Sequence, residues 1–546
     1  MVAAPFFGTT GTCLRELAQR WPDKPALLAD ERRLTFAEYD AEANRLAHYL
    51  RDAGIRKGDN VGLVLVNCPE LATALVALHK VGAVACLWNF RLASGDIGYL
   101  VRKSQAPLVI FNADFQATVL AAGALAGVRP RYLCVETADA AGQVEHLAGA
   151  LAGAPAHEPP DAAPQADDPC TVIYTSGTTG RPKGAAFTHT SQALSALQYS
   201  LEMGLDRGHV GLSAAPIIHG AATNFFAAFH FLGATQVLCG RYEAGKVLRQ
   251  ITEHRVTELM AVPTQMEELA RLGAAQGGNA TPTLRLIRSG GSRLTPGVVE
   301  RVKAALGSDI LNTYGMTENC SNTTAFSTAI DPPEKYASIG KATHFWELRV
   351  VTDDREREVS PDEVITPPGR GQLIVRGKQN VSGYYLAPEE PLRLRDGWLY
   401  TRDIVEVDDD GYLLLVDRID NIIISGGINI YPQEVEQVLL DHPKVREAAV
   451  IGVPDPKWDE AVAAIIVPKD AALSAAELDA YCRCHEGLAN FKRPRHFVFV
   501  ETLPRNVLGK VERERLKKEY TGLAGAQAAA ATAGPPAAAK PSRPTG

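Results

Sequence analysis

The strongest constraint on the fold is a repeated alternation of short apolar runs with longer amphipathic segments, over residues 10–114 and again over residues 171–310. Residues 35–52 carry apolar side chains close to helical spacing, residues 61–66 form a short run of strand type, and residues 71–81 return to a helical pattern. Strands that alternate with helices in this way pair in parallel and are covered by the helices. These two regions therefore predict α/β structure.

The length and charge of the chain limit the classes of protein to which it can belong. Its 546 residues exceed the usual size of one domain, roughly 100–200 residues, so we expect several domains. The 56 basic and 63 acidic side chains give a formal net charge of −7, whereas nucleic-acid-binding domains are basic, so we expect no nucleic-acid partner. Nine cysteines are few for this length and odd in number, which favours a reducing, cytoplasmic location over a disulfide scaffold.

One segment has the composition of a possible membrane span, because residues 208–240 contain no Asp, Glu, Lys or Arg. Histidine, proline, asparagine and glycine interrupt this segment, and its apolar residues are mostly alanine. A spanning helix is a more continuous run of large apolar side chains. We therefore predict a buried helix beside a ligand pocket, and no transmembrane span.

The most informative motif is the string Tyr-Thr-Ser-Gly-Thr-Thr-Gly-Arg-Pro-Lys-Gly at residues 174–184, which follows an apolar run of strand type. Its hydroxyl groups and backbone N–H groups can donate to phosphate oxygens, and Lys183 adds a positive charge. The string is not a Walker loop, because two residues rather than four separate Gly177 from Gly180 and no Gly-Lys-Ser/Thr follows. It predicts a phosphate-binding loop of another type.

This string resembles the phosphate loop of the adenylate-forming superfamily, which includes acyl-CoA synthetases, peptide-synthetase adenylation domains and beetle luciferases. Further segments resemble the motifs of that superfamily in the same order along the chain: residues 289–292, 312–318, 397–403, 417–420, 425–427 and 504–510. The resemblance implies an α/β fold with a large N-terminal domain, containing two helix-covered, mostly parallel sheets and a small β-barrel-like part, and a small mobile α+β C-terminal domain. We expect an N-terminal adenylation domain over residues 1–419, a C-terminal domain over 420–520 and a disordered Ala/Pro/Gly tail over 521–546.

The resemblance also implies an ATP site. It assigns to ATP binding the residues Thr175, Ser176, Gly177, Thr178, Thr179, Lys183, Gly290, Gly291, Ser292, Asn312, Thr313, Tyr314, Thr317, Asp403 and Arg418. Within this set, Tyr314 offers a flat face to adenine, and the carboxylate of Asp403 accepts hydrogen bonds from both ribose hydroxyls.

Three residues are expected to be catalytic: Lys510, Glu318 and Thr317. Transfer of the adenylyl group depends mainly on positioning and on stabilising negative charge, with a divalent metal beside the phosphates. Glu318 is a hard oxygen ligand suited to Mg²⁺, and Thr175 is the second expected metal ligand. Thr317 can donate to the α-phosphate, and Lys510 supplies a mobile positive charge between the substrate carboxylate and the phosphate.

A second half-reaction with coenzyme A is implied as well. The C-terminal domain is expected to rotate about a hinge at Asp420 and to present Ser425, Gly426 and Gly427, whose small side chains let a pantetheine arm pass close to the backbone. Acetylation of Lys510 would remove its charge and would switch off adenylation.

The acyl pocket is assigned to His219, Gly220, Thr223 and Gly290. Amino-acid-activating relatives usually place an aspartate in this segment, and its absence here argues against an amino-acid substrate. Neighbouring alanines and phenylalanines indicate an apolar pocket, so we expect a medium- or long-chain fatty acid and, as an alternative, an aryl or hydroxycinnamic acid.

Two other functions remain open. An acyl-adenylate ligase would load the thiol of an acyl carrier protein instead of coenzyme A. A catalytically silent adenylate-binding protein would be expected to lack Lys510, Glu318 or the phosphate loop, and all three are present. The oligomeric state, monomer or homodimer, also remains open.

Overall fold

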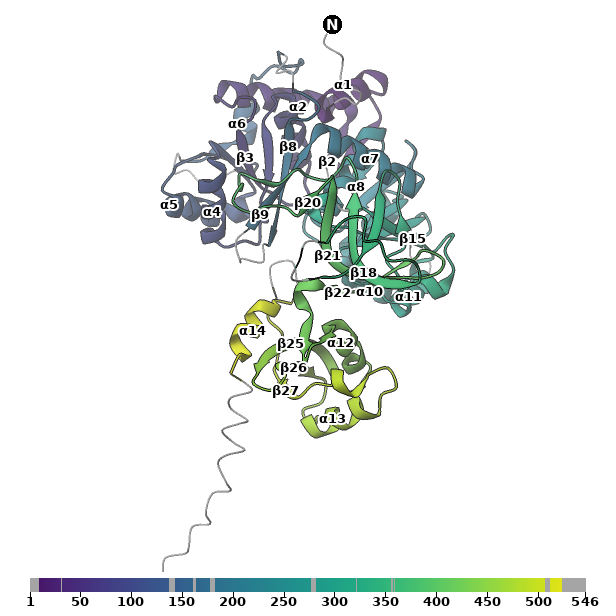
Figure 1. The fold of residues 1–546 in the computed structure, drawn as a ribbon. Coiled ribbons are helices and arrows are strands. Elements are labelled where there is room, and N and C mark those ends of the chain that lie inside the picture. The colour runs from purple at the N-terminus through teal and green to yellow at the C-terminus, as the bar shows by residue number, and fades with distance from the viewer. Residues whose placement is uncertain are drawn as a thin grey trace, which may run out of the picture. The chain divides into compact units, whose positions relative to one another are not determined.

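The computed structural model describes residues 9–30, 32–136, 143–160, 164–176, 182–275, 281–320, 322–354, 357, 359–505 and 511–522. The chain divides into two compact units (Figure 1). Unit 1 comprises Met1–Thr352, Val359–Thr401 and Glu406–Leu414, and unit 2 comprises Asp353–Glu358, Arg402–Val405 and Leu415–Gly546.

Unit 1 contains a nine-stranded sheet with the order β16 (Lys341–Ala342), β15 (Thr324–Ser327), β14 (Asp309–Tyr314), β13 (Leu286–Gly290), β12 (Glu258–Met260), β10 (Val210–Ser213), β11 (Thr235–Val237), β1 (Pro25–Ala29) and β2 (Arg32–Thr35). The strands from β14 to β1 in this order pair in parallel. Strands β2, β15 and β16 add antiparallel pairs at the two edges.

A second sheet of eight strands has the order β19 (Tyr384–Tyr385), β9 (Pro182–Thr188), β8 (Pro169–Ser176), β4 (Val84–Leu87), β3 (Asn60–Val64), β5 (Leu108–Phe111), β6 (Arg131–Cys134) and β7 (Glu145–His146). Its strands from β8 to β7 pair in parallel, whereas β9 and β19 pair antiparallel. The strand predicted over residues 61–66 is β3.

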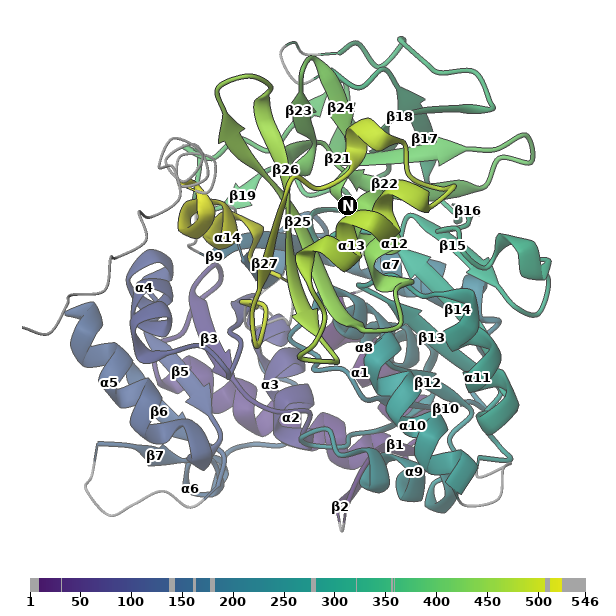
Figure 2. The ribbon, with the colours of Figure 1, turned by 90° about the horizontal axis from the view of Figure 1, so that it is seen from below.

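Helices cover both faces of each sheet (Figure 2). The layer between the sheets contains α1 (Thr10–Arg20), α2 (Phe36–Asp52), α3 (Pro69–Lys80), α7 (His189–Met203) and α8 (Gly220–Leu232). The outer faces are covered by α4 (Ser94–Ser104) and α5 (Gln116–Ala126) on the eight-stranded sheet, and by α9 (Ala244–Glu253), α10 (Pro263–Ala275) and α11 (Pro296–Leu306) on the nine-stranded sheet. A short helix, α6 (Leu147–Leu151), follows β7.

A third sheet of five strands consists of β17 (Glu347–Val351), β18 (Gly369–Arg376), β21 (Trp398–Val407), β20 (Leu394–Arg395) and β22 (Leu413–Arg418). The division between the two units passes through β21 and β22.

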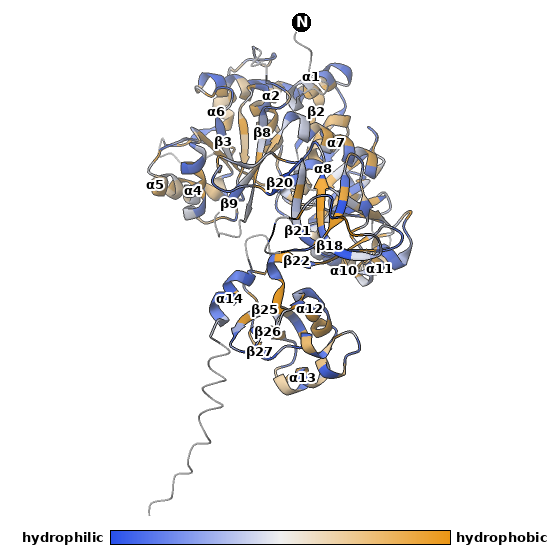
Figure 3. Cartoon of the chain, in the orientation of Figure 1, coloured by the Kyte–Doolittle hydropathy of each residue, from blue (hydrophilic) through white to orange (hydrophobic). Residues whose placement is uncertain are grey.

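Unit 2 contains its own five-stranded sheet, formed by β24 (Ile428–Ile430), β23 (Ile423–Ser425), β26 (Asp459–Pro468), β25 (Val445–Asp455) and β27 (His496–Phe499). Its helices are α12 (Pro432–Leu440), α13 (Ala475–Cys484) and α14 (Arg513–Tyr520). Apolar clusters lie on the two faces of the sheet, and Figure 3 shows β25 as hydrophobic and α14 as largely hydrophilic. The predicted α/β architecture, with two mostly parallel sheets and a small α+β domain, is confirmed.

Local sequence explains where the predicted elements begin. Helix α2 starts one residue after Thr35, whose hydroxyl accepts from the Glu38 backbone N–H while the Glu38 side chain accepts from the Thr35 N–H. This reciprocal capping box satisfies two donors that the helix itself leaves unpaired. Residues 208–240 contain the buried helix α8, and in the described parts of the chain we find no helix with the length and apolarity needed to cross a membrane. All nine cysteines are free thiols.

Candidate active site

The hairpin of β8 and β9 carries the predicted phosphate loop. Thr175 lies opposite Lys183 in the antiparallel ladder, and its hydroxyl donates to the Lys183 carbonyl oxygen at 3.5 Å. Strand β9 begins at Pro182. The hairpin therefore fixes the positions at which the loop leaves and rejoins the sheet.

Several predicted residues lie outside the described part of the chain: the side chain of Ser176, Gly177, Thr178, Thr179 and Lys510.

The side chain of Lys183 is held by two residues from a segment later in the chain, Glu390 and Tyr384. Its ammonium forms an ion pair with Glu390 and lies 5.2 Å from the centre of the Tyr384 ring, which gives a cation–π contact. Only 14% of the Lys183 side chain is exposed. The segment reaches Lys183 because Tyr384 belongs to β19, which pairs with β9.

Glu318 lies in a short 3₁₀ turn, Thr317–Asn319, that follows β14. The residue is 7% exposed, and its Oε1 accepts a hydrogen bond of 2.7 Å from the Tyr384 hydroxyl. Its backbone oxygen accepts from the Val381 N–H at 2.9 Å. We call Lys183, Glu318, Tyr384 and Glu390 the lysine–glutamate corner, in which the structure brings together one residue from each of two predicted motifs.

Strands β13 and β14 bring two more predicted segments side by side. Gly290 pairs with Thr313, and the Thr313 hydroxyl donates to the Ser289 carbonyl oxygen at 3.0 Å. A Cβ at Gly290 would lie 2.7 Å from the Thr313 carbonyl oxygen, so glycine permits this close approach. Ligands of open α/β sheets bind beyond the carboxyl ends of parallel strands, where Gly290 and Tyr314 both lie.

Two buried polar atoms at these strand ends have no hydrogen-bond partner among the described residues, Ser289 Oγ and Asn312 Oδ1. Burial of an unsatisfied polar group is costly, so such atoms are typical of a site that a ligand completes. The remaining predicted residues of this region, Gly291, Ser292 and Thr317, are exposed or half-buried.

The predicted acyl segment forms the start of α8. His219 precedes the helix, Gly220 is its first residue, and Thr223 is fully buried with its hydroxyl donating to the Ile217 and His219 carbonyl oxygens. The next residue, Asn224, donates to the Cys320 carbonyl oxygen at 2.7 Å. This bond ties the acyl segment to the turn that carries Glu318.

The apolar side of α8 packs beneath the strands that lead to the site. One cluster joins its residues to strands β12, β13 and β14: Ala222, Phe225, Ala228, Phe229, Met260, Leu286 and Leu311. The surroundings of the acyl segment are therefore apolar, and the acyl pocket itself stays a prediction.

Arg288 is a residue of this region that the sequence analysis missed. It lies two positions before Gly290, is 1% exposed, and donates to the Tyr199 hydroxyl at 2.7 Å and to the Met260 sulfur at 3.1 Å. Burial lowers the pKa of its guanidinium. The only signal in the sequence is an arginine inside an otherwise strand-like run, and such a residue normally lies at a surface.

Unit 2 contains the predicted ribose, arginine and hinge residues. The Arg418 Nε lies 3.5 Å from an oxygen of Asp403, so these two predicted ATP residues are brought together. The Arg402 Nε donates to both carboxylate oxygens of Asp420 at 2.9 and 2.8 Å. Arg402 has a φ of +63°, a left-handed conformation that non-glycine residues rarely adopt.

The predicted pantetheine residues form the tight turn between β23 and β24. Ser425 pairs with Ile428, so Gly426 and Gly427 are the two central residues, with φ values of +58° and +77°. Hairpin turns with two positive φ values strongly favour glycine. The glycines are therefore explained by the turn itself, in addition to the close approach of a ligand that we expected.

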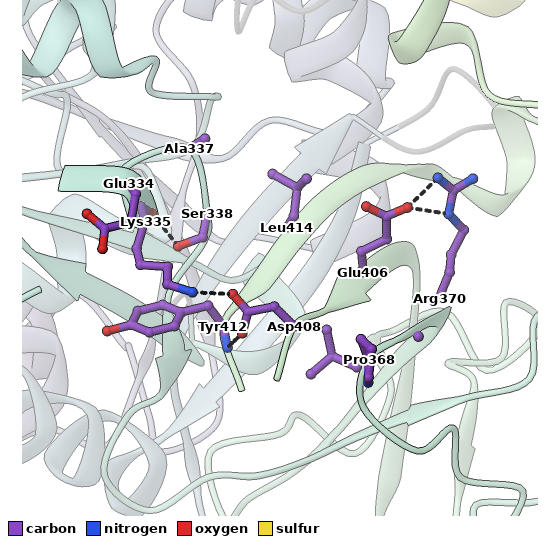
Figure 4. A pocket seen from close by; sticks show the side chains of 12 residues that line it. Glu334, Lys335, Ala337, Ser338, Pro368, Arg370, Glu406, Asp408, Tyr412 and Leu414 are labelled. Carbon is purple, nitrogen blue, oxygen red and sulfur yellow. Dashed lines mark hydrogen bonds and ion pairs between the residues drawn. The ribbon is translucent and has the colours of Figure 1, made fainter. Parts of the chain in front are cut away.

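A cavity of about 560 Å³ lies elsewhere in unit 1 (Figure 4). Four of its five charged side chains are already paired with one another: Lys335 with Asp408 at 2.7 Å, and Arg370 with Glu406 at 2.9 Å. None of the predicted site residues lines it. We therefore place the chemistry at the strand ends and not in this cavity.

Comparison with known proteins identifies two matching family models. Residues 14–385 match the AMP-binding enzyme model, and residues 434–510 match the AMP-binding enzyme C-terminal domain.

Curated relatives cover almost the whole chain. A feruloyl-CoA synthase of Amycolatopsis sp is 34% identical over 491 residues, covering 89% of this chain and 94% of the relative. A long-chain-fatty-acid–CoA ligase of Mycobacterium tuberculosis is 34% identical over 498 residues, covering 90% of this chain and 93% of the relative.

Solved structures agree with these matches. The o-succinylbenzoate CoA synthetase of Bacillus subtilis in complex with its acyl-adenylate intermediate has a TM-score of 0.79 and 30% identity, covering 92% of this chain and 97% of that chain. The same enzyme with ATP and a magnesium ion has a TM-score of 0.78 and 30% identity, covering 92% of this chain and 99% of that chain.

The order of the motifs, the two-sheet fold and these matches agree with one another. The chain is an AMP-forming acid–thiol ligase and belongs to the AMP-binding enzyme family of the adenylate-forming superfamily.

Proposed function

We propose that this enzyme is an ATP-dependent acyl-CoA synthetase that activates a medium- or long-chain fatty acid. In the first half-reaction a carboxylate oxygen bonds to the α-phosphorus of ATP and the bond to the β-phosphate oxygen breaks, which releases pyrophosphate. In the second, the sulfur of coenzyme A attacks the acyl carbon, AMP leaves with the bonding electrons, and the thiol proton passes to solvent.

The lysine–glutamate corner is the observation that carries the proposal. Phosphate binding needs a positive charge and metal binding needs a hard oxygen ligand, and this corner holds Lys183 and Glu318 around one tyrosine ring. We assign Lys183 to the phosphates and Thr317 to the α-phosphate. Tyr314 is assigned to adenine.

The remaining assignments of the ATP reaction follow the resemblance. We propose Asp403 as the acceptor for the ribose hydroxyls and Arg418 as its neighbour in the ATP site. Lys510 is proposed to lie between the substrate carboxylate and the phosphate during adenylation. The residues 420–520 are proposed as the domain that moves between the half-reactions, with Asp420 as its hinge.

The chemistry of the donor set fits Mg²⁺ bound largely by the substrate. Among the described residues no group of three or more His, Cys, Asp or Glu side chains is arranged to hold a metal, whereas the buried Glu318 offers one carboxylate. Mg²⁺ commonly binds one or two carboxylates together with substrate phosphates. When bound, it would spread the negative charge that develops on the phosphates, and Glu318 and Thr175 would be its protein ligands.

The apolar cluster around α8 supports an apolar acid, which favours the fatty-acid substrate. An aryl or hydroxycinnamic acid is the second candidate, because the feruloyl-CoA synthase is as similar in identity as the fatty-acid ligase. Loading of a carrier-protein thiol is the third, since the first half-reaction would be the same.

A panel of fatty, aryl and dicarboxylic acids, assayed for pyrophosphate release with and without coenzyme A, tests the proposal. We expect fatty acids to dominate and turnover to require coenzyme A. A single burst that coenzyme A leaves unchanged would favour the carrier-loading ligase, and dominance of an aryl acid would favour the second candidate.

The Lys510→Ala variant separates the half-reactions. We expect adenylation to be abolished while thioester formation from a supplied acyl adenylate continues. Equal loss of both half-reactions would contradict the role assigned to Lys510.

A further inference from the structure

We infer that Tyr384 is a positioning residue of the adenylation half-reaction, which holds both Glu318 and Lys183 in the geometry that magnesium–ATP requires. This inference rests on the proposed function, and it concerns a residue outside every motif that the sequence analysis selected. Its basis is the position of one side chain between two charged groups.

The Tyr384 hydroxyl fixes one half of the Glu318 carboxylate. It donates to Oε1 at 2.7 Å. A carboxylate held at one oxygen keeps a single orientation, so the other oxygen can be directed at a cation. Partners of this kind around metal ligands typically change metal affinity by about 10- to 100-fold when they are removed.

The ring of Tyr384 acts on Lys183. The ammonium lies 5.2 Å from the ring centre, and Glu390 from the same segment completes its surroundings. Long lysine side chains lose much conformational freedom when they are held, so a prearranged ammonium binds phosphate at a lower entropic cost. One residue thus couples the phosphate ligand to the metal ligand.

The backbone around Tyr384 is itself anchored on both sides. Tyr384 pairs with Ala185 of β9, close to Lys183 in the same strand. On the other side, the Val381 N–H donates to the Glu318 carbonyl oxygen, and the Cys320 thiol donates to the Gln379 carbonyl oxygen at 3.3 Å. Residues 379–385 therefore link the phosphate hairpin to the turn of Glu318.

The adjacent tyrosine provides a matched control. Successive side chains of a strand point to opposite faces, and the Tyr385 hydroxyl donates to Asn60 Oδ1 at 2.9 Å. The Tyr384→Phe and Tyr385→Phe variants each remove one hydroxyl, from neighbouring positions of β19. Only the first removes a partner of Glu318.

The test measures binding of a non-hydrolysable ATP analogue by titration calorimetry, with and without Mg²⁺, in the full-length wild type and both variants. We expect Tyr384→Phe to weaken magnesium-dependent binding by about 10- to 100-fold and to leave magnesium-free binding unchanged. Tyr385→Phe should leave both unchanged. Tyr384→Leu, which also removes the ring, should weaken binding by about a further two- to five-fold even without Mg²⁺.

Two results would overturn the inference. The first is magnesium-dependent affinity in Tyr384→Phe equal to that in Tyr385→Phe. The second is an equal loss with and without Mg²⁺, which would indicate a general packing defect. Thermal unfolding of the Tyr384→Phe and Tyr385→Phe variants checks that the two proteins are folded to the same extent.

A Glu318→Gln variant distinguishes failure of this inference from failure of the proposed function. If Glu318→Gln binds the analogue with undiminished magnesium dependence, then Glu318 is not the metal ligand and the proposed function has failed at this residue. If Glu318→Gln loses that dependence while Tyr384→Phe keeps it, only the role of Tyr384 is wrong.

Discussion

Charged side chains are held in place differently in the lysine–glutamate corner of unit 1 and in the Arg402–Asp420 pair of unit 2. In the corner, Glu318 is 7% exposed and is held by one hydrogen bond to its side chain and one to its backbone oxygen. In unit 2, the Asp420 side chain is 41% exposed, and its partner Arg402 has a strained backbone with φ of +63°.

The difference indicates which groups are fixed by the fold and which can change partners. A buried carboxylate with hydrogen bonds to its side chain and to its backbone moves only if the surrounding packing moves. A half-exposed ion pair contributes little stability, and a left-handed residue stores strain that is released when the chain changes conformation. We therefore expect the corner to remain constant during the reaction and the pair to respond to movement at the proposed hinge.

The largest expected effect is a loss of folding stability in acid, caused by histidines buried in the interior of unit 1. Burial lowers the pKa of His189 and of His230 to about 4, from an ordinary 6.5. The unfolded chain binds protons at these groups below about pH 6.5, whereas the folded chain binds them only near pH 4, so stability is lost as the pH falls between these values. The expected loss is about 3 kcal/mol per histidine.

Urea unfolding at a series of pH values measures this loss. In a His189→Gln variant, the free energy of unfolding should fall less steeply between pH 6.5 and pH 4 than in the wild type. An unchanged slope would mean that His189 is not buried in its neutral form.

Two glycine substitutions compare the two regions directly. Gly290→Ala should destabilise unit 1 by about 2 kcal/mol, because the new Cβ would lie 2.7 Å from the Thr313 carbonyl oxygen. Gly427→Ala should cost about 1 kcal/mol, because its φ is +77° while, among the described residues other than its chain neighbours, no atom lies within 4 Å of the new Cβ. Chemical denaturation measures both, and equal costs would contradict the distinction between packing and backbone conformation.

The strain at Arg402 should appear in a pair of substitutions. Both Arg402→Ala and Arg402→Gly remove the bond to Asp420, but only glycine accommodates a φ of +63° without strain. We expect the glycine variant to be more stable than the alanine variant by about 1 kcal/mol. Equilibrium unfolding of the two proteins tests this, and a more stable alanine variant would show that the backbone is not strained.

The smallest expected effect concerns salt. A double-mutant cycle of Arg402→Ala and Asp420→Ala should give a coupling of about 0.5 kcal/mol that declines as salt approaches about 1 M. A parallel cycle of Lys183→Met and Glu390→Gln should depend less on salt, because those side chains are 14% and 24% exposed. Equal salt dependence of the two cycles would remove the contrast between the regions.

Much of the fold could be predicted because its elements are specified locally. The helical spacing of residues 35–52 predicts α2 to within one residue. The motif residues Lys183, Glu318 and Asp403 were found because their segments resemble, in order along the chain, the motifs of the adenylate-forming superfamily.

The sequence by itself thus determined the alternating α/β architecture, the family and the residue types of the site. Only the tertiary structure decided that Tyr384 lies between Lys183 and Glu318, because β19 has two residues and takes its place through pairing with β9. It also decided that the Arg288 side chain is buried. These features depend on contacts between segments far apart in the chain, and no local pattern of hydrophobicity or spacing encodes which strand a short segment joins.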